Sequence, residues 1–208
     1  MALTSRVSIL FCGNCVSIRS ASSAELNLSS TPIIKQKSGL AIHRVRPRRQ
    51  LKVEPRSIYV SEDVNALLHG GARAATANFP DHRAHALIDS FIAGEFLSVS
   101  LLGDPSKKSP ELERMSNVDE VWLICFRKAS DNQWRIMGRF SKFNTFIGLA
   151  IHKRSDLGGR TKGRKNYELK AEEFIEQWND RFRRAEPHRG VHWTDYLSGP
   201  VKDVDESF

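Results

Sequence analysis

The chain has 208 residues, of which 40% are hydrophobic and 27% are charged, and its formal net charge is +8. This length and composition predict one ordinary hydrophobic core with an appendage. The first apolar stretch, Val7–Ile18, is interrupted at Gly13 and followed at once by Arg19, which excludes a secretory signal and a membrane span.

The first 56 residues carry the whole net charge. They contain ten Lys and Arg but only two acids, Glu25 and Glu54, whereas the remainder contains 22 residues of each sign. Such a basic, Ser-rich segment is typical of an organelle transit peptide, but also of a disordered basic arm or an upstream extension absent from the mature protein. We therefore predict a cytoplasmic protein, with mitochondrion or chloroplast as the alternative if the segment is a transit peptide.

Three cysteines cannot pair completely, which favours a reducing compartment. Cys12 and Cys15 have CxxC spacing, but there is no second CxxC and no nearby His pair to complete four zinc ligands. Cys125 falls in an apolar strand pattern. We predict no metal and no cofactor.

The first elements of the body are a strand and two helices. Arg56–Ser61 is a short strand pattern, and a helix is expected from Asp63 to about Asn78. Pro80 breaks the pattern, after which apolar residues at spacings of three and four predict a helix from Asp81 to about Ala93. Residues 102–110 contain glycine and two prolines and are predicted to be a surface loop.

Three apolar segments then follow, rich in β-branched and aromatic residues and separated by polar turns. They are Glu120–Arg127, Trp134–Phe140 and Phe146–Lys153, and they predict a three-strand antiparallel meander. Pairing Arg127 with Trp134, and Phe140 with Thr145, fixes which side chains share a face.

With this pairing, one face of the meander carries only apolar and small side chains, as expected of a core. Its members are Val121, Leu123, Cys125, Trp134, Ile136, Gly138, Phe140, Ile147, Leu149 and Ile151. The opposite face is predicted to place arginines among aromatic rings. Its members are Trp122, Ile124, Phe126, Arg135, Met137, Arg139, Phe146, Gly148, Ala150, His152 and Arg154.

This second face has two interpretations. In one, helices cover it and the arginine stems pack along apolar surface. In the other, the face is open, the arginines bind phosphate, and the aromatic rings hold the arginines or stack on bases. Residues 127–165 carry eleven Lys and Arg against two Asp, a local charge of +9 that favours the open face.

The last predicted helix is Tyr167–Arg184, which has an apolar stripe and an N-cap candidate at Asn166. The basic segment Ser155–Lys165 before it is either a linker or a phosphate-contacting loop. Beyond Pro187 we expect a short turn to dock on the body. The prediction is thus a leader (1–56), a small α+β domain (57–186) with its C-terminal helix packed on one sheet face, and a C-terminal extension (187–208).

The run Leu112–Arg114, followed by the strands EVWLICFR, WRIMGRF and FIGLAIHKR, resembles the RelE/ParE/HigB superfamily of small bacterial toxins over about Ile58 to Phe182. The resemblance implies binding to RNA or the ribosome, an acidic antitoxin-like protein partner, and metal-independent cleavage of mRNA by attack of a ribose 2′-OH on its own phosphate.

The resemblance also implies roles for particular residues, with neither metal nor membrane involved. The catalytic candidates are His152, Arg135, Arg139 and Tyr167. The RNA-binding candidates are Arg127, Lys153, Arg154, Trp122 and Phe126. The alternatives are that His152 is an ordinary surface histidine, that Tyr167 simply packs, and that the protein is a non-catalytic module docking an acidic partner on its basic sheet face or an organelle-targeted protein of another role.

Overall fold

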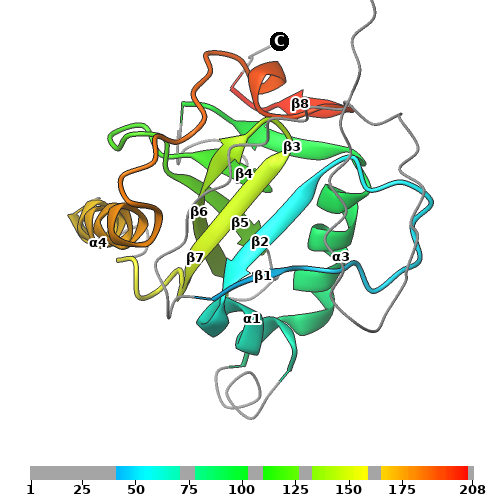
Figure 1. Cartoon of the computed structure of the whole chain (residues 1–208), viewed down its shortest axis with the longest axis horizontal. Coiled ribbons are helices and arrows are strands. Elements are labelled where there is room, and N and C mark those ends of the chain that lie inside the picture. The colour runs from blue at the N-terminus through cyan, green and yellow to red at the C-terminus, as the bar shows by residue number, and fades with distance from the viewer. Residues whose placement is uncertain (1–40, 71–77, 103–109, 127–132, 159–164, 206–208) are drawn as a thin grey trace, which may run out of the picture. The chain divides into compact units, whose positions relative to one another are not determined.

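The computed structural model describes residues 41–70, 78–102, 110–126, 133–158 and 165–205. These residues build one mixed sheet of eight strands in the order β1-β2-β7-β6-β5-β4-β3-β8 (Figure 1). The strands are β1 (Ile42–Arg44), β2 (Ser57–Ser61), β3 (Leu97–Ser100), β4 (Leu112–Arg114), β5 (Trp122–Phe126), β6 (Trp134–Lys142), β7 (Thr145–Lys153) and β8 (Val201–Asp203).

The predicted meander exists as β5, β6 and β7, but the predicted α+β fold with a three-strand sheet is wrong. β2 pairs in parallel with β7, β3 pairs in parallel with both β4 and β8, and the other neighbours are antiparallel. Three of the five additional strands are only three residues long, too short to show an alternating pattern in sequence.

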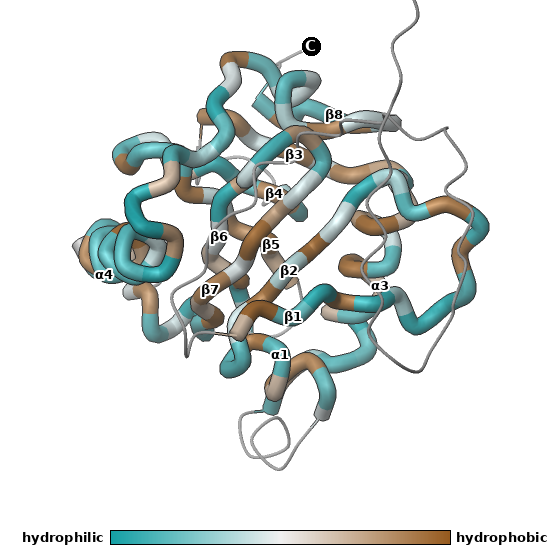
Figure 2. The backbone as a smooth tube through the Cα atoms, in the orientation of Figure 1, coloured by the Kyte–Doolittle hydropathy of each residue, from teal (hydrophilic) through white to brown (hydrophobic). Residues whose placement is uncertain are grey.

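Helices cover both faces of the sheet. α1 (Glu62–Leu68) and α3 (Asp81–Ile92) lie on one side and α4 (Lys165–Phe182) on the other, as Figure 1 shows. Each side has its own apolar core, and the central strands, flanked by more polar connections, carry brown segments in Figure 2. No helix in the described ranges is long and apolar enough to cross a membrane.

The predicted distribution of side chains over the two faces is also wrong. Phe126, not Arg127, is opposite Trp134, and Phe140 is opposite Phe146. Each difference is one residue, and a one-residue shift moves every side chain of a strand to the other face. A bulge between Met137 and Gly138 shifts the register once more.

As a result, the aromatic rings and the arginines lie on opposite faces. Trp122, Phe126 and Phe146 belong to the core beneath α1 and α3, whereas Arg135 and Arg139 point toward α4. The two arginines are 4% and 3% exposed. The helix-covered interpretation of their face is therefore confirmed, and neither RNA nor a partner helix can lie flat on this part of the sheet.

Part of the predicted leader belongs to the folded body. β1 extends the sheet beyond β2, and the basic residues around it form ion pairs with acids of the body, as Arg48 does with Asp81 and Arg49 with Glu95. The chain beyond Pro187 is also packed in place, because Tyr196 and Leu197, just after a short 3-10 turn at Trp193–Asp195, are buried. The predicted docking of this turn is thus confirmed.

Candidate functional site

Arg135, the second residue of β6, is the most unusual side chain on the α4 side. It lies opposite Cys125 of β5 and His152 of β7. Its Nε atom is buried without a hydrogen-bond partner, and its guanidinium makes no ion pair with any described residue. Arginine stays charged in proteins. Burying a charge without a partner lowers the free energy of unfolding by several kcal/mol, because the charge loses its hydration. Such a cation requires an anion.

Glu113 and Cys125 lie beside Arg135. Glu113 of β4 is opposite Leu123 of β5, so it shares the α4 side of the sheet, and its carboxyl lies 3.9 Å from the Cys125 sulfur. Burial lowers the pKa of Arg135, but the neighbouring Cys125, Tyr167 and Glu113 together raise it by more. The guanidinium is therefore near acidic groups without being paired to one.

The Glu113 carboxyl forms no ion pair with Arg135. Burial raises its pKa and outweighs the opposing effects of Arg135 and Arg154. A carboxyl with a raised pKa retains its proton to a higher pH, and in that form it is a hydrogen-bond donor.

Replacing Glu113 with Gln should therefore change stability in a pH-dependent way. Because the folded-state pKa of Glu113 lies above its ordinary value of 4.5, its contribution to stability is present at acidic pH and lost as the pH rises through the raised pKa. We expect Glu113→Gln to be more stable than the wild type at pH 8, with the difference shrinking toward pH 4.5. Urea unfolding at several pH values measures this; a difference that does not vary with pH would contradict it.

Tyr167 lies in the first turn of α4. Burial raises the pKa of its phenol, so the O–H remains a donor at neutral pH. The first turn of a helix also leaves backbone N–H groups without partners inside the helix and carries partial positive charge. Glu168, in the same turn, accepts a hydrogen bond from Asn117 Nδ2 at 3.1 Å, which attaches this end of α4 to the β4–β5 connection.

His152 and Arg154 complete the group from β7 and the residue just after it. Burial and the nearby Lys170 lower the pKa of His152, so the imidazole is neutral near pH 7. Arg154 donates to Gln133 Oε1 at 2.6 Å, and its charge acts on both Glu113 and Tyr167.

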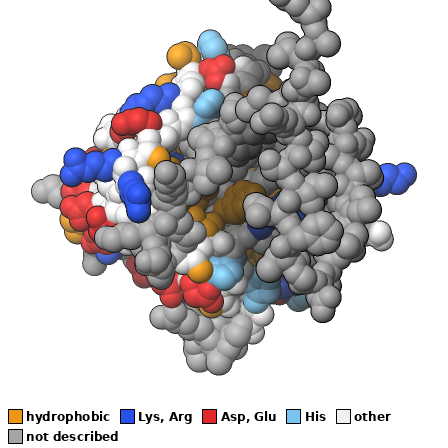
Figure 3. All heavy atoms as spheres, in the orientation of Figure 1, with side chains coloured by type: hydrophobic (Ala, Val, Ile, Leu, Met, Phe, Trp, Pro, Cys, Tyr) orange, Lys and Arg blue, Asp and Glu red, His pale blue; other side chains and the backbone are white. Residues whose placement is uncertain are grey.

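Six residues, which we call the Arg135 cluster, come from four neighbouring strands, the position just after β7, and α4. They are Glu113, Cys125, Arg135, His152, Arg154 and Tyr167. The cluster holds two guanidinium groups and a single carboxyl with a raised pKa, so its balance is cationic. On the face drawn in Figure 3, the region of α4 carries both acidic and basic side chains.

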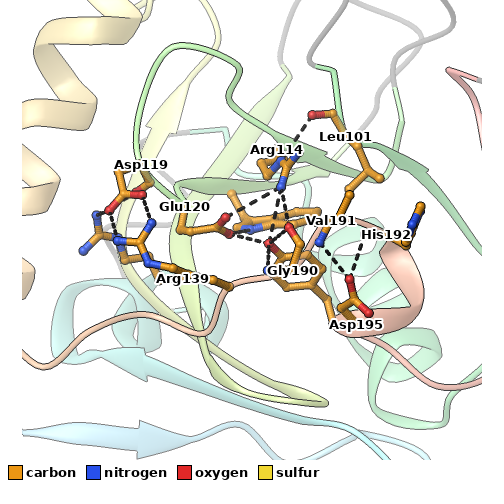
Figure 4. A network of polar contacts seen from close by, with 12 residues as sticks. Leu101, Arg114, Asp119, Glu120, Arg139, Gly190, Val191, His192 and Asp195 are labelled. Atoms are coloured by element: carbon orange, nitrogen blue, oxygen red, sulfur yellow. Dashed lines mark hydrogen bonds and ion pairs between the residues drawn. The ribbon is translucent and has the colours of Figure 1, made fainter.

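Arg139 belongs to a different network, under the C-terminal half of α4. Its Nη2 donates to the Asp119 carbonyl at 2.7 Å, and the Asp119 carboxylate binds Arg189 through both oxygens (Figure 4). The guanidinium also lies 5.6 Å from the Trp178 ring centre. This network borders a cavity of about 600 Å³ that Glu176 and Asp180 also line. In contrast to Arg135, Arg139 has partners for its charge.

The strap formed by residues 187–198 is fixed to the sheet by Tyr196. Its O–H donates to Glu120 Oε2 at 2.7 Å and accepts from the Gly190 N–H, while Arg114 donates to the Gly190 carbonyl. Burial and the Glu120 carboxylate raise the pKa of Tyr196 to about 12. Glu120 adopts a left-handed backbone conformation (φ 51°), which directs its side chain into this network.

The predicted RNA-binding aromatic residues are not available to bases. Trp122 and Phe126 are 0% and 1% exposed, and Trp122 packs against Phe140 and Tyr196 in the core on the α1 and α3 side. Lys153 lies over the Trp134 ring on that same side. The prediction that Trp122 and Phe126 stack on RNA is therefore wrong, and Arg127 lies outside the described residues.

The structure thus brings together three of the four predicted catalytic residues, His152, Arg135 and Tyr167, and places Arg154 with them. Glu113 was not among the predicted site residues, because β4 shows no periodicity that reveals its face, and Cys125 was assigned only to the core. In the described part of the chain, no three His, Cys, Asp or Glu side chains are close enough together to hold a metal ion.

The fold and site define a mixed α/β domain, covered by helices on both faces, with a buried arginine that forms no ion pair among the described residues beneath the N-terminal part of one helix. Comparison of the chain with protein-family models, curated proteins and solved structures gave no match. Function is therefore inferred from the chemistry of the Arg135 cluster.

Proposed function

We propose that this domain binds RNA and that the Arg135 cluster holds one of its phosphate groups. The observation that carries the proposal is Arg135 itself, a buried cation without a partner among the described residues. A phosphate matches the planar, two-pronged donor pattern of a guanidinium and supplies the missing negative charge.

The surroundings of Arg135 support an anion as the ligand. Arg154 adds a second guanidinium, the Tyr167 O–H is a donor, and α4 begins at this point with its partially positive end. The acids within reach are few: Glu113 has a raised pKa, and Asp156 and Glu173 act on His152.

RNA, rather than an isolated anion, is favoured by the charge of the chain around the cluster. Residues 127–165, which include β6, β7 and the start of α4, carry a net +9 in a body that is otherwise acidic. An excess of cations in the sequence is typical of chains that contact a polyanionic strand, and such contacts hold the backbone without reading sequence.

Cleavage of RNA is a second candidate function, and it requires the cluster to hold an internal phosphodiester. Attack of a 2′-OH on the adjacent phosphate needs a base to take the hydroxyl proton, an acid to protonate the leaving 5′-oxygen, and cations to stabilise the pentavalent phosphate. His152 as a neutral imidazole, Tyr167 as a phenol and Arg135 with Arg154 supply these types of group.

Fluorescence anisotropy with a labelled single-stranded RNA tests the binding. We expect Arg135→Gln to weaken binding about 10- to 100-fold, the effect of one charge-assisted contact, and to reduce the salt slope by about 0.7. Arg46→Gln is the matched control, because this substitution removes the same charge at an exposed position.

Equal, small effects of the two substitutions would overturn a phosphate site at Arg135. The same samples on a denaturing gel test cleavage: products ending in a 2′,3′-cyclic phosphate that disappear with His152→Ala are expected. RNA that stays intact with the wild-type protein would contradict the catalytic part and leave the binding part standing.

A further inference from the structure

We infer that the Arg135 cluster selects a terminal phosphate of RNA, a phosphomonoester, over the internal phosphodiesters of the strand. The inference rests on the binding part of the proposed function and names the group within RNA that the site recognises. It is an alternative to cleavage, because cleavage requires an internal phosphodiester at the same residues. Its support is the burial of Arg135 and the number of donors that surround it.

The burial of Arg135 restricts what can approach its guanidinium. The residue is 4% exposed, and the strands on both sides of β6 place Cys125 and His152 directly beside it. An internal phosphodiester carries a ribose on each side and cannot enter such a site without bringing both sugars. A terminal phosphate carries only one ribose, so it brings fewer bulky groups to the buried guanidinium.

The donors of the cluster also exceed what a phosphodiester can use. A diester has two non-bridging oxygens and a single negative charge, whereas a monoester has three terminal oxygens and about −1.5 to −2 charges near pH 7. The cluster presents two guanidinium groups and the Tyr167 O–H, and Glu113 adds a further donor while it keeps its proton. A monoester therefore matches the charge and the number of donors of the cluster more closely than a diester does.

Charges that oppose an incoming phosphate are few and lie at the edge of the cluster. Asp205 acts on Glu113 from the C-terminal end of the described chain, and Asp156 and Glu173 lie toward His152. No carboxylate among the described residues forms an ion pair with Arg135 or Arg154. A terminal phosphate therefore need not displace an existing ion pair of either guanidinium.

The test compares four versions of one single-stranded RNA: hydroxyl at both ends, 5′-phosphate, 3′-phosphate, and phosphate at both ends. We expect one terminal phosphate to tighten binding to the wild-type protein about tenfold, and the other end to have little effect, which identifies the end recognised. The preference should fall as the pH drops below about 6, where the monoester loses its second charge. Millimolar inorganic phosphate should compete with the phosphorylated RNA and much less with the hydroxyl-ended RNA.

Arg135→Gln and Arg154→Gln should each remove the preference, and Arg46→Gln should retain it. If Arg135→Gln folds poorly, Arg154→Gln still tests the inference. Arg154 follows β7 and is only partly buried, so its substitution is expected to disturb folding less. Equal binding of all four RNAs, with binding still sensitive to Arg135→Gln, would overturn the terminal-phosphate inference alone. Binding insensitive to Arg135→Gln would overturn the proposed phosphate site as well, and a preference that survives both substitutions would place the terminal phosphate elsewhere.

Discussion

Replacing Arg135 with Met is expected to raise the free energy of unfolding by about 1 to 3 kcal/mol while abolishing the RNA binding that depends on Arg135. Met preserves the length of the buried stem but removes a charge that has no ion-pair partner among the described residues. The substitution breaks no ion pair, and burial already raises the pKa of the neighbouring Glu113 carboxyl. A buried cation that costs stability is what an anion-binding site requires.

Urea unfolding of the two proteins without ligand measures this effect. Arg46→Met is the matched control, and a change within about 0.5 kcal/mol is expected there, as for most exposed positions. Adding phosphorylated RNA should stabilise only the wild type, since a ligand stabilises in proportion to its binding to the folded state. A loss of more than 1 kcal/mol in Arg135→Met would instead mean that the guanidinium has a structural role.

The same substitution at Arg56 is expected to have the opposite sign, a loss of about 3 to 5 kcal/mol. Arg56 is fully buried, and its guanidinium donates through Nε to the Ser198 carbonyl at 3.0 Å and through Nη1 to the Glu95 carbonyl at 3.3 Å. Its centre also lies 5.6 Å from the Phe91 ring centre. Burial lowers the pKa of Arg56 to about 10, which still leaves it charged at neutral pH.

Arg56→Met would leave these carbonyl groups buried without donors and release the C-terminal segment from β2. Each buried polar group without a partner costs about 1 to 3 kcal/mol, so two carbonyls account for most of the expected loss. Urea unfolding of Arg56→Met and Arg135→Met, measured side by side, compares two buried arginines. The two differ mainly in whether the guanidinium has hydrogen-bond partners. Opposite signs are expected, and an Arg56→Met protein as stable as Arg46→Met would contradict the structural role of Arg56.

The sequence predicts the longer elements well. α3 and α4 follow apolar spacings of three and four, and β5, β6 and β7 are long apolar runs bounded by polar turns. α1 ends at Leu68, just before Gly70, and most of the remainder of the predicted helix, to about Asn78, lies outside the described residues. The short strands β1, β4 and β8 exist because longer neighbours offer them backbone partners, and three residues carry too little pattern to predict that.

The site was predicted in part, for a reason that concerns strand register. Arg135 and His152 were expected on one face and do share one, because they lie opposite each other on β6 and β7. Trp122 and Phe126 were placed with them by a loop pairing that is one residue different from the observed one. The length of a loop does not determine its turn geometry or the position of a bulge. The strand register therefore could not be predicted to a single residue from the sequence pattern.

The central claim is that the Arg135 guanidinium is buried in order to hold a phosphate. Two-dimensional ¹⁵N–¹H NMR of the arginine Nε–H groups observes this directly, with the Arg135 signal assigned by its absence from Arg135→Lys. On adding the phosphorylated RNA, we expect the Arg135 Nε–H signal to move and its exchange with water to slow, with Arg154 responding to a smaller extent. An Arg135 signal that is unchanged when the RNA is bound, while exposed arginines such as Arg46 shift, would contradict the claim.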